Sequence, residues 1–366
     1  MAGKEVVPVS AARPDMVATV RMARGWTQRE LAERADLTPS SISQVESGRL
    51  ELTGATLKRV AEALECPEDL LATEVPESGV DVTCLHHRRR SSTMTAVTRK
   101  RVEALTHLTR VSVRGLLADV ALRPQLPLRR PQTALADDPA AMAQRTRSAW
   151  QLPAGPIADL TRVLEAAGII IVARDLHTSG QDAVSSWPAD EHERPIIVVR
   201  NDLPTDRWRF TLAHELGHLL MHGWVDDGQE EQANEFASEF LAPRNDIEAE
   251  LQGLRTGDFT RLLNLKQRWG ISVAALIRRA FTLDIITDRQ YREFHVRLNQ
   301  MHWRRVEPGT LPPEQPSILS RVIKLRIDAG DVLEAIASDA RMTVHSFCKV
   351  FLEPKQPRLS LDLEAP

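Results

Sequence analysis

Cysteine is scarce in this 366-residue chain, and several common signatures are missing altogether. The three cysteines, Cys66, Cys84 and Cys348, lie far apart and form no Cys-x-x-Cys pair, which argues for a reducing compartment. No apolar run reaches about 18 residues and no signal-peptide core opens the chain, so we expect a cytoplasmic protein without a membrane partner. No Gly-rich phosphate loop is present, which removes the usual sign of a P-loop nucleotide site.

The bulk composition is that of a folded protein with unevenly distributed charge. Apolar residues make up 42% of the chain, and its length suggests two to three domains. The net charge of −3 hides a basic segment from His86 to Arg130, in which eleven Lys and Arg face two acids and leave +9. Such a segment suits a phosphate partner, but it is also typical of a solvated helix face, and both interpretations stay open.

The most informative stretch runs from Phe210 to His222 and contains His214-Glu215-x-x-His218. Side chains four residues apart stand on one face of a helix, so the two histidines can bind one ion, at roughly 2.0–2.1 Å for zinc. Glu215 projects about 100° further round, toward the flank where water and substrate would lie. This is the geometry of a zincin peptidase, in which the ion acidifies a water and the glutamate takes its proton.

The neighbouring residues favour a buried site over a helix with two surface histidines. Leu212, Leu216 and Leu219 supply apolar positions around the motif, and a buried Glu-His pair without a task is costly. Gly217 inside a helix costs about 1 kcal/mol relative to Ala, so we expect another element to pack closely there. His222 lies about 12 Å along the axis from His214, too far for both to bind one ion.

A second helix is predicted after a turn that contains two glycines, Gly223 and Gly228, so an antiparallel helix pair is expected. Its apolar residues repeat at helical spacing: Ala233, Phe236, Ala237, Phe240 and Leu241. Glu230 and Asn234 share one face of this helix. Glu230 can complete a His₂Glu site for Zn²⁺, with Mn²⁺ as the alternative ion, and Asn234 can support a ligand.

Together these residues resemble the ImmA/IrrE metallopeptidases, bacterial gluzincin-like proteins that relieve repression by cleaving repressors. The resemblance rests on Arg209-Phe210-Thr211-Leu212-Ala213-His214-Glu215-Leu216-Gly217-His218 and on Glu-x-x-x-Asn-x-Phe-Ala-x-x-Phe-Leu-x-Pro, which ends at Pro243. It covers roughly Pro156 to Leu283. It implies metal ligands at His214, His218 and Glu230 and a catalytic glutamate at Glu215. Because Glu230 is followed by Glu231, the third ligand stays open between the two.

The N-terminal part has the pattern of a small helical bundle. Thr27 and Glu30 have the spacing of a capping box, and Pro39 stands at the first position of a helix expected over Thr38–Glu46. Arg24-Gly25-Trp26-Thr27-Gln28-x-x-Leu31-Ala32 and Leu37-Thr38-x-x-x-Ile42-Ser43-x-x-Glu46-x-Gly48 resemble the XRE (lambda-repressor/Cro-like) helix-turn-helix family over residues 16–73. Asp36 departs from the family, where Gly is usual, but Asp tolerates the left-handed turn.

This second resemblance implies a duplex DNA operator as partner, with Thr38–Glu46 as the recognition helix. Short polar side chains there suit groove edges, and those at the start of the preceding helix suit phosphates. The expected contacts are Thr27, Gln28, Thr38, Ser40, Ser41, Ser43 and Gln44. In a homodimer, two half-sites about one helical turn apart are expected. A module of this shape used only for protein contacts is the alternative.

We therefore predict a mostly α protein with a small β-sheet (α+β). The predicted organisation is a tail at 1–15, the helix-turn-helix domain at 16–73, a basic helical segment and Pro-rich connector at 74–155, a zincin-like domain at 156–283 and a helical C-terminal region of unknown role at 284–366. A long helix is expected from Met94 to about Leu122. Two β-branched runs, Ile169–Ala173 and Pro195–Val199, and a weaker strand pattern at Ala183–Trp187 predict a three-stranded sheet.

Two functions compete at this point. The first is a DNA-binding regulator that is also a zinc-dependent endopeptidase, cleaving a repressor, an antitoxin or itself to relieve repression under stress. The second is a non-enzymatic repressor or antitoxin that uses the zincin-like domain as a sensor or protein-interaction scaffold. The intact motif favours the first, because a scaffold does not need Glu215. The side chains that could stabilise an oxyanion are the single tyrosine, Tyr291, and His177, His192 and His222.

Overall fold

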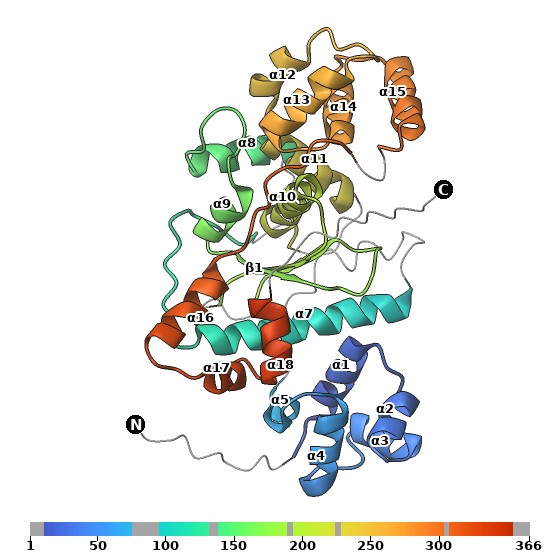
Figure 1. Ribbon diagram of the computed structural model, residues 1–366, viewed down its shortest axis with the longest axis vertical. Coiled ribbons are helices and arrows are strands. Elements are labelled where there is room, and N and C mark those ends of the chain that lie inside the picture. Colours follow the sequence, from blue (N-terminus) through green and yellow to red (C-terminus); the bar gives the residue numbers. More distant parts are fainter. Residues whose placement is uncertain are drawn as a thin grey trace, which may run out of the picture.

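The structure is a computed structural model that describes residues 11–74, 95–131, 138–188, 193–223, 228–303 and 307–353. The first part of the basic segment, up to residue 94, lies outside the described residues, as do most of the expected tail and the residues after 353. The predicted class is confirmed, because helices dominate and surround one three-stranded sheet (Figure 1). No helix in the described part of the chain is long and apolar enough to cross a membrane.

Five short helices form the N-terminal bundle: α1 (Pro14–Arg24), α2 (Gln28–Arg34), α3 (Pro39–Glu46), α4 (Gly54–Ala63) and α5 (Glu68–Ala72). The predicted capping box is confirmed, since the Thr27 hydroxyl accepts from the Glu30 N–H and the Glu30 carboxylate accepts from the Thr27 N–H. Asp36 has a φ of 52°, the left-handed turn expected of it. The helices close around an apolar core that includes Leu31 and Ile42.

Helix α7 (Ala96–Leu117) lies between the bundle and the rest of the molecule and packs against both (Figure 1). Its Val111 belongs to the core of the bundle, whereas Val113 and Leu116 face the sheet. The helix ends before the predicted Leu122. The predicted helix was too long because Val120 and Leu122 continue the helical spacing of apolar residues. In the structure their N–H groups instead donate to nearby carbonyls and close turns.

The sheet consists of β1 (Ile170–Arg174), β2 (Ala183–Ser186) and β3 (Ile196–Arg200) in the order β1-β3-β2. Strand β3 is central, pairing parallel with β1 and antiparallel with β2. Alternate side chains enter two different cores. Ile171 and Ile197 lie in a core with the helices of residues 139–300, whereas Ile170 and Ile196 face α7 and the C-terminal helices. Burial on both faces explains why the strands read as continuous apolar runs.

The zincin-like part contains the two predicted helices, α10 (Thr205–Met221) and α11 (Gln229–Leu241), together with α9 (Leu160–Ala166), α12 (Arg244–Leu251), α13 (Phe259–Trp269) and α14 (Val273–Thr282). One more helix, α8 (Pro139–Ala149), lies in the segment expected to be a connector. Pro139 begins this helix instead of breaking one, and Asp138 caps it. The Arg147 side chain then donates to the Phe240 carbonyl and docks α8 on α11.

The C-terminal region is helical, as predicted, and wraps around the zincin-like part. Its helices are α15 (Asp288–Gln300), α16 (Ile318–Asp328), α17 (Leu333–Asp339) and α18 (Val344–Phe347), which ends in a π-helical turn (Cys348–Leu352). Ile323, Ile336 and Phe347 cover the second face of the sheet beside α7. The residues 307–317, here called the strap, connect α15 to α16 across the start of α10 (Figure 1).

Candidate metal centre

The site lies where α10 and α11 pack closely against each other. Most of α10 is buried, including all residues from Thr211 to Leu219. Gly217 permits the close contact: a Cβ placed there would lie 3.1 Å from the Phe236 ring and 3.3 Å from the Ala233 Cα. The close neighbour expected from this glycine is therefore α11. The two helices are joined by a short connection, so their facing side chains meet across a narrow gap.

Three metal-ligating side chains converge between these helices. The Nε2 atoms of His214 and His218 are 3.0 Å apart. The two carboxylate oxygens of Glu230 lie 3.6 Å from His214 Nε2 and 3.4 Å from His218 Nε2. Donors bound at roughly 2.0–2.2 Å to one tetrahedral ion are separated by about 3.3–3.6 Å, so this set fits a divalent cation. Glu231 lies on the exposed side of α11 and is not part of the group.

Hydrogen bonds orient both imidazole rings toward the same point. Asn234 Oδ1 lies 3.0 Å from His214 Nδ1, so this nitrogen donates to the amide oxygen and Nε2 carries no hydrogen. On the other side, His218 Nδ1 lies 2.8 Å from His222 Nδ1. His218 is fully buried. Two imidazole nitrogens and a carboxylate at these distances form a negative pocket that favours a cation.

Glu215 follows the first histidine of the group and is only 2% exposed. Its neighbours on α10 are the two histidines, and the same helix therefore carries both the candidate ligands and a carboxylate. A carboxylate beside a metal-bound water is the arrangement that hydrolytic metal sites use for proton transfer. The burial also removes water that would weaken the electrostatic interactions of the site.

The four oxyanion candidates have different environments. His222 is buried behind His218 and contacts it directly. Tyr291 stacks on Phe281, between α14 and α15. His177 is partly exposed, and its Nδ1 lies 3.1 Å from an Asp175 carboxylate oxygen. His192 lies outside the described residues. Of the three that the structure describes, His222 is the one that contacts a member of the histidine and glutamate group.

Several polar residues hold α10 in place, and these were not predicted from the sequence. Arg209 and Glu314 of the strap form a buried ion pair, and the Glu314 carboxylate also accepts from the Leu160 and Thr161 N–H groups at the start of α9. Lys266 binds Asp206 at 2.7 Å and Glu307 at 3.0 Å. These pairs join segments far apart in sequence. No local pattern signals them, because the partners lie 41 or more positions apart in sequence.

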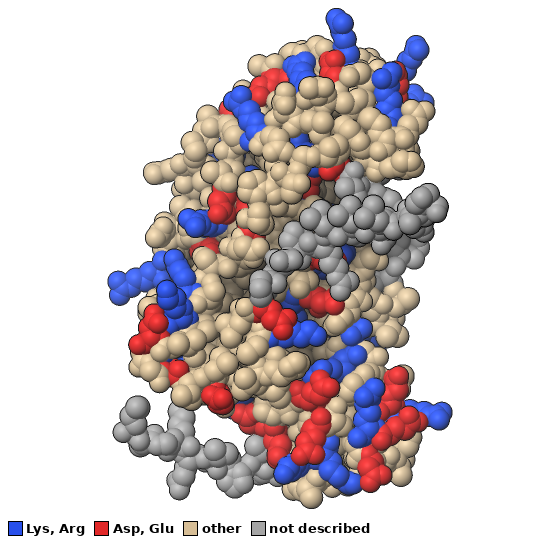
Figure 2. All heavy atoms as spheres, viewed as in Figure 1, with Lys and Arg blue, Asp and Glu red and all other residues tan. Residues whose placement is uncertain are grey.

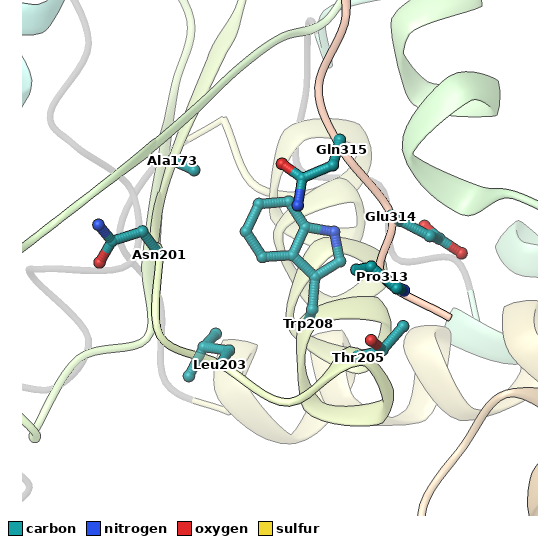
Figure 3. A pocket seen from close by; sticks show the side chains of 8 residues that line it. All are labelled: Ala173, Asn201, Leu203, Thr205, Trp208, Pro313, Glu314 and Gln315. Carbon is teal, nitrogen blue, oxygen red and sulfur yellow. The ribbon is translucent and has the colours of Figure 1, made fainter. Parts of the chain in front are cut away.

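A small, partly open pocket lies where the strap crosses the start of α10 (Figure 3). The Trp208 ring stands near its centre, between the loop after β3 and the strap. Its lining residues are Ala173, Asn201, Leu203, Thr205, Trp208, Pro313, Glu314 and Gln315. None of them belongs to the group around His214, so this pocket is separate from the candidate metal centre.

The predicted DNA contacts divide into exposed side chains and structural ones. Ser40, Ser43 and Gln44 are exposed on α3. Thr27 and Thr38 cap α2 and α3 with their hydroxyl groups, and Ser41 is partly buried beside Thr38. The Gln28 amide donates to Glu46, which also accepts two hydrogen bonds from Arg21. This last network holds α1, α2 and α3 together and had not been predicted.

The described part of the basic segment is used largely inside the molecule. Arg101 donates to the Ala23 carbonyl at the end of α1. Arg110 donates to the Ser186 hydroxyl and the Trp187 carbonyl, and Arg130 donates to the Pro188 carbonyl. On the face shown in Figure 2, basic and acidic side chains lie side by side over the α1–α5 end. The +9 charge of the segment therefore includes docking groups as well as exposed ones.

Two parts of the chain match known family models. Residues 164–281 match the IrrE N-terminal-like domain of peptidase M78, and residues 17–71 match a helix-turn-helix model. Both resemblances are thereby confirmed, in the predicted order. No curated protein matches the chain at a significant level. The matches support a DNA-binding regulator that carries a metallopeptidase-like domain, and this domain holds a possible His/Glu metal site.

Proposed function

We propose that this chain is a DNA-binding regulator whose peptidase-like domain is a zinc-dependent endopeptidase. Its ligands are His214, His218 and Glu230, Asn234 orients His214, and Glu215 is the general base. The supporting observation is the convergence of two Nε2 atoms and one carboxylate within 4.8 Å of one another. The substrate is a repressor, an antitoxin or the chain itself, and its cleavage relieves repression under stress.

The residues divide the work of peptide hydrolysis among them. When bound, the ion supplies Lewis-acid chemistry that acidifies water and polarises a peptide carbonyl. Asn234 keeps the His214 proton on Nδ1, so that Nε2 is available as a ligand. Glu215 accepts the proton of the attacking water and returns it to the leaving amine. Glu230 adds negative charge that balances the ion.

The enzyme is favoured over a scaffold by the position of Glu215. A carboxylate that is 2% exposed lowers the stability of a folded protein unless its surroundings compensate. A domain that only senses or binds a partner gains nothing from a buried glutamate next to a metal ligand. A peptidase gains its proton acceptor there.

DNA binding is assigned to the other end of the molecule. Ser40, Ser43 and Gln44 lie exposed on one helix of the bundle, as side chains that read groove edges must. Thr27, Gln28, Thr38 and Ser41 stand at helix starts or beside them, where backbone N–H groups suit phosphates. A cleavage event would reach this module through α7, which contacts α1 as well as the sheet.

The deciding experiment compares wild type with Glu215→Gln. Co-encoded repressor proteins are incubated with each protein, with Zn²⁺, with Mn²⁺ and with a chelator, and cleavage is followed by mass spectrometry. We expect metal-dependent cleavage by wild type and a loss of about 10²–10⁴-fold in Glu215→Gln. Both proteins should bind metal and DNA equally. In cells, Glu215→Gln should act as a permanent repressor. Normal induction by this variant would show that proteolysis is not the switch.

A further inference from the structure

His222 cannot share one ion with the group, yet it is buried against it. The side chain is 4% exposed, and its ring centroid lies 4.9 Å from that of His218. Its Nδ1 is 2.8 Å from His218 Nδ1, on the side of that ring opposite the candidate metal. Its Nε2 is 2.9 Å from Gln232 Oε1 on α11. Both ring nitrogens of His222 therefore have hydrogen-bond contacts.

The direction of these hydrogen bonds follows from the acceptor at the end. Gln232 Oε1 can only accept, so His222 Nε2 carries the hydrogen. A neutral imidazole has one hydrogen, so His222 Nδ1 is then an acceptor. It receives the Nδ1 hydrogen of His218, so the Nε2 atom of His218 carries no hydrogen. Gln232 thus sets the tautomers of two histidines in series.

We propose that His222 and Gln232 are positioning residues that hold His218 in its metal-binding tautomer. They act on His218 as Asn234 acts on His214. The inference rests on the metal site of the proposed function, and it adds two residues that touch neither substrate nor ion. Such hydrogen bonds fix the ring orientation of a ligand as well as its tautomer.

Variants can separate an acceptor from mere packing. His222→Leu removes the acceptor beside His218 and keeps an apolar side chain. His222→Asn places an amide oxygen close to the position of Nδ1 and can still accept. Gln232 is exposed on α11, so Gln232→Ala should fold normally while leaving the direction of the His222 hydrogen bonds undefined. Glu235→Ala, also exposed on α11, is the matched control.

The measurement is the Zn²⁺ dissociation constant of the metal-free full chain, obtained by competition with a chelator. We expect His222→Leu to weaken binding by about 10–100-fold, Gln232→Ala to weaken it less, and Glu235→Ala to leave it unchanged. His222→Asn should recover most of the loss. The visible spectrum of the Co²⁺-loaded protein should change in His222→Leu and match wild type in His222→Asn.

Several results would overturn the proposal. One is wild-type affinity in His222→Leu. Another is an equal loss in the Leu and Asn variants, which would show that an acceptor at this position does not hold His218; a lowered thermal unfolding temperature of the metal-free protein would then assign His222 to packing. If His222→Leu does not fold, Gln232→Ala decides, and an affinity equal to that of Glu235→Ala rejects the relay. A wild-type chain that binds no Zn²⁺ would reject the metal centre of the proposed function along with it.

Discussion

The helix-turn-helix bundle and the peptidase-like domain place their polar side chains in opposite ways. Among the described residues 11–74, Thr19 is the only buried polar one, and the expected DNA contacts Ser43 and Gln44 are exposed. In the peptidase-like domain the functional candidates on α10 are inside: His218 is fully buried, and Glu215 nearly so. A surface function can be read from single exposed side chains. A buried one depends on the partners that each side chain meets.

The interactions that join segments also differ between the two regions, in how far apart in sequence the partners lie. The bundle is held by helix caps such as Thr27–Glu30, which are local in sequence, and by the Arg21–Glu46 pair, whose members are 25 positions apart. The peptidase-like domain is held by buried ion pairs such as Arg209–Glu314, whose members are 105 positions apart. Local caps leave each helix start largely independent of the rest. Buried distant pairs make α10 depend on the strap, so changes there should reach the candidate metal centre.

Removal of a ligand should have the largest effect. His218→Ala should abolish stoichiometric Zn²⁺ binding, because it removes one donor of a three-residue site. Glu230→Ala should weaken binding strongly, whereas Glu231→Ala should match wild type. Isothermal titration of metal into the metal-free chain checks all three. If Glu231→Ala weakens binding and Glu230→Ala does not, the third ligand is Glu231. If neither substitution weakens binding, the third ligand is not on α11.

Loss of a buried partner should be the next largest effect. Glu314→Ala leaves Arg209 buried without its carboxylate and should lower the free energy of unfolding by about 3–5 kcal/mol. The exposed pair Arg29–Glu33 in the bundle is the control, and Glu33→Ala should unfold like wild type. Urea unfolding followed by circular dichroism gives both values. Equal effects of the two substitutions would remove the contrast between the domains.

Two substitutions test which polar groups read DNA. Gln44→Ala should lower the discrimination between operator and random DNA by about 1–3 kcal/mol while leaving stability unchanged. Arg110→Ala should leave this discrimination unchanged and lower the stability, because Arg110 donates to Ser186 and Trp187 at 2.8 Å. Fluorescence anisotropy at several salt concentrations measures the affinities. A large fall in DNA affinity for Arg110→Ala would instead indicate that the basic segment binds DNA phosphates.

The smallest expected effect is a dependence of stability on pH through α7. Burial lowers the pKa of His107 below its usual 6.5, and Arg110 adds to the decrease while Glu103 opposes it. Since the folded state favours the neutral ring, the stabilisation is complete above about pH 6.5 and is lost as the pH falls through the lowered pKa. His107→Gln should therefore flatten the fall in unfolding free energy between pH 7.5 and 5.5. An unchanged slope would contradict this.

Local patterns were enough where neighbours in sequence are also neighbours in space. The spacing of Thr27 and Glu30 predicted a capping box, and Gly217 predicted a close helix contact, now seen with Phe236. The spacing of His214, His218 and Glu230 placed three donors on facing helices. The spacing of apolar residues extended the predicted α7 too far, past Val120. Helix α8 was not predicted, because Pro139 can begin a helix as readily as it breaks one.

By itself, the sequence determined the two modules, their order and the residues that stand on one face of each helix, because helical periodicity relates residues three and four apart. Only the tertiary structure decided that Glu230 and not Glu231 faces the histidines, since that choice depends on how α11 is rotated against α10. It also decided that Glu314 binds Arg209 and that Gln232 reaches His222. These contacts join side chains whose separation depends on the packing of whole elements, and no local pattern specifies it.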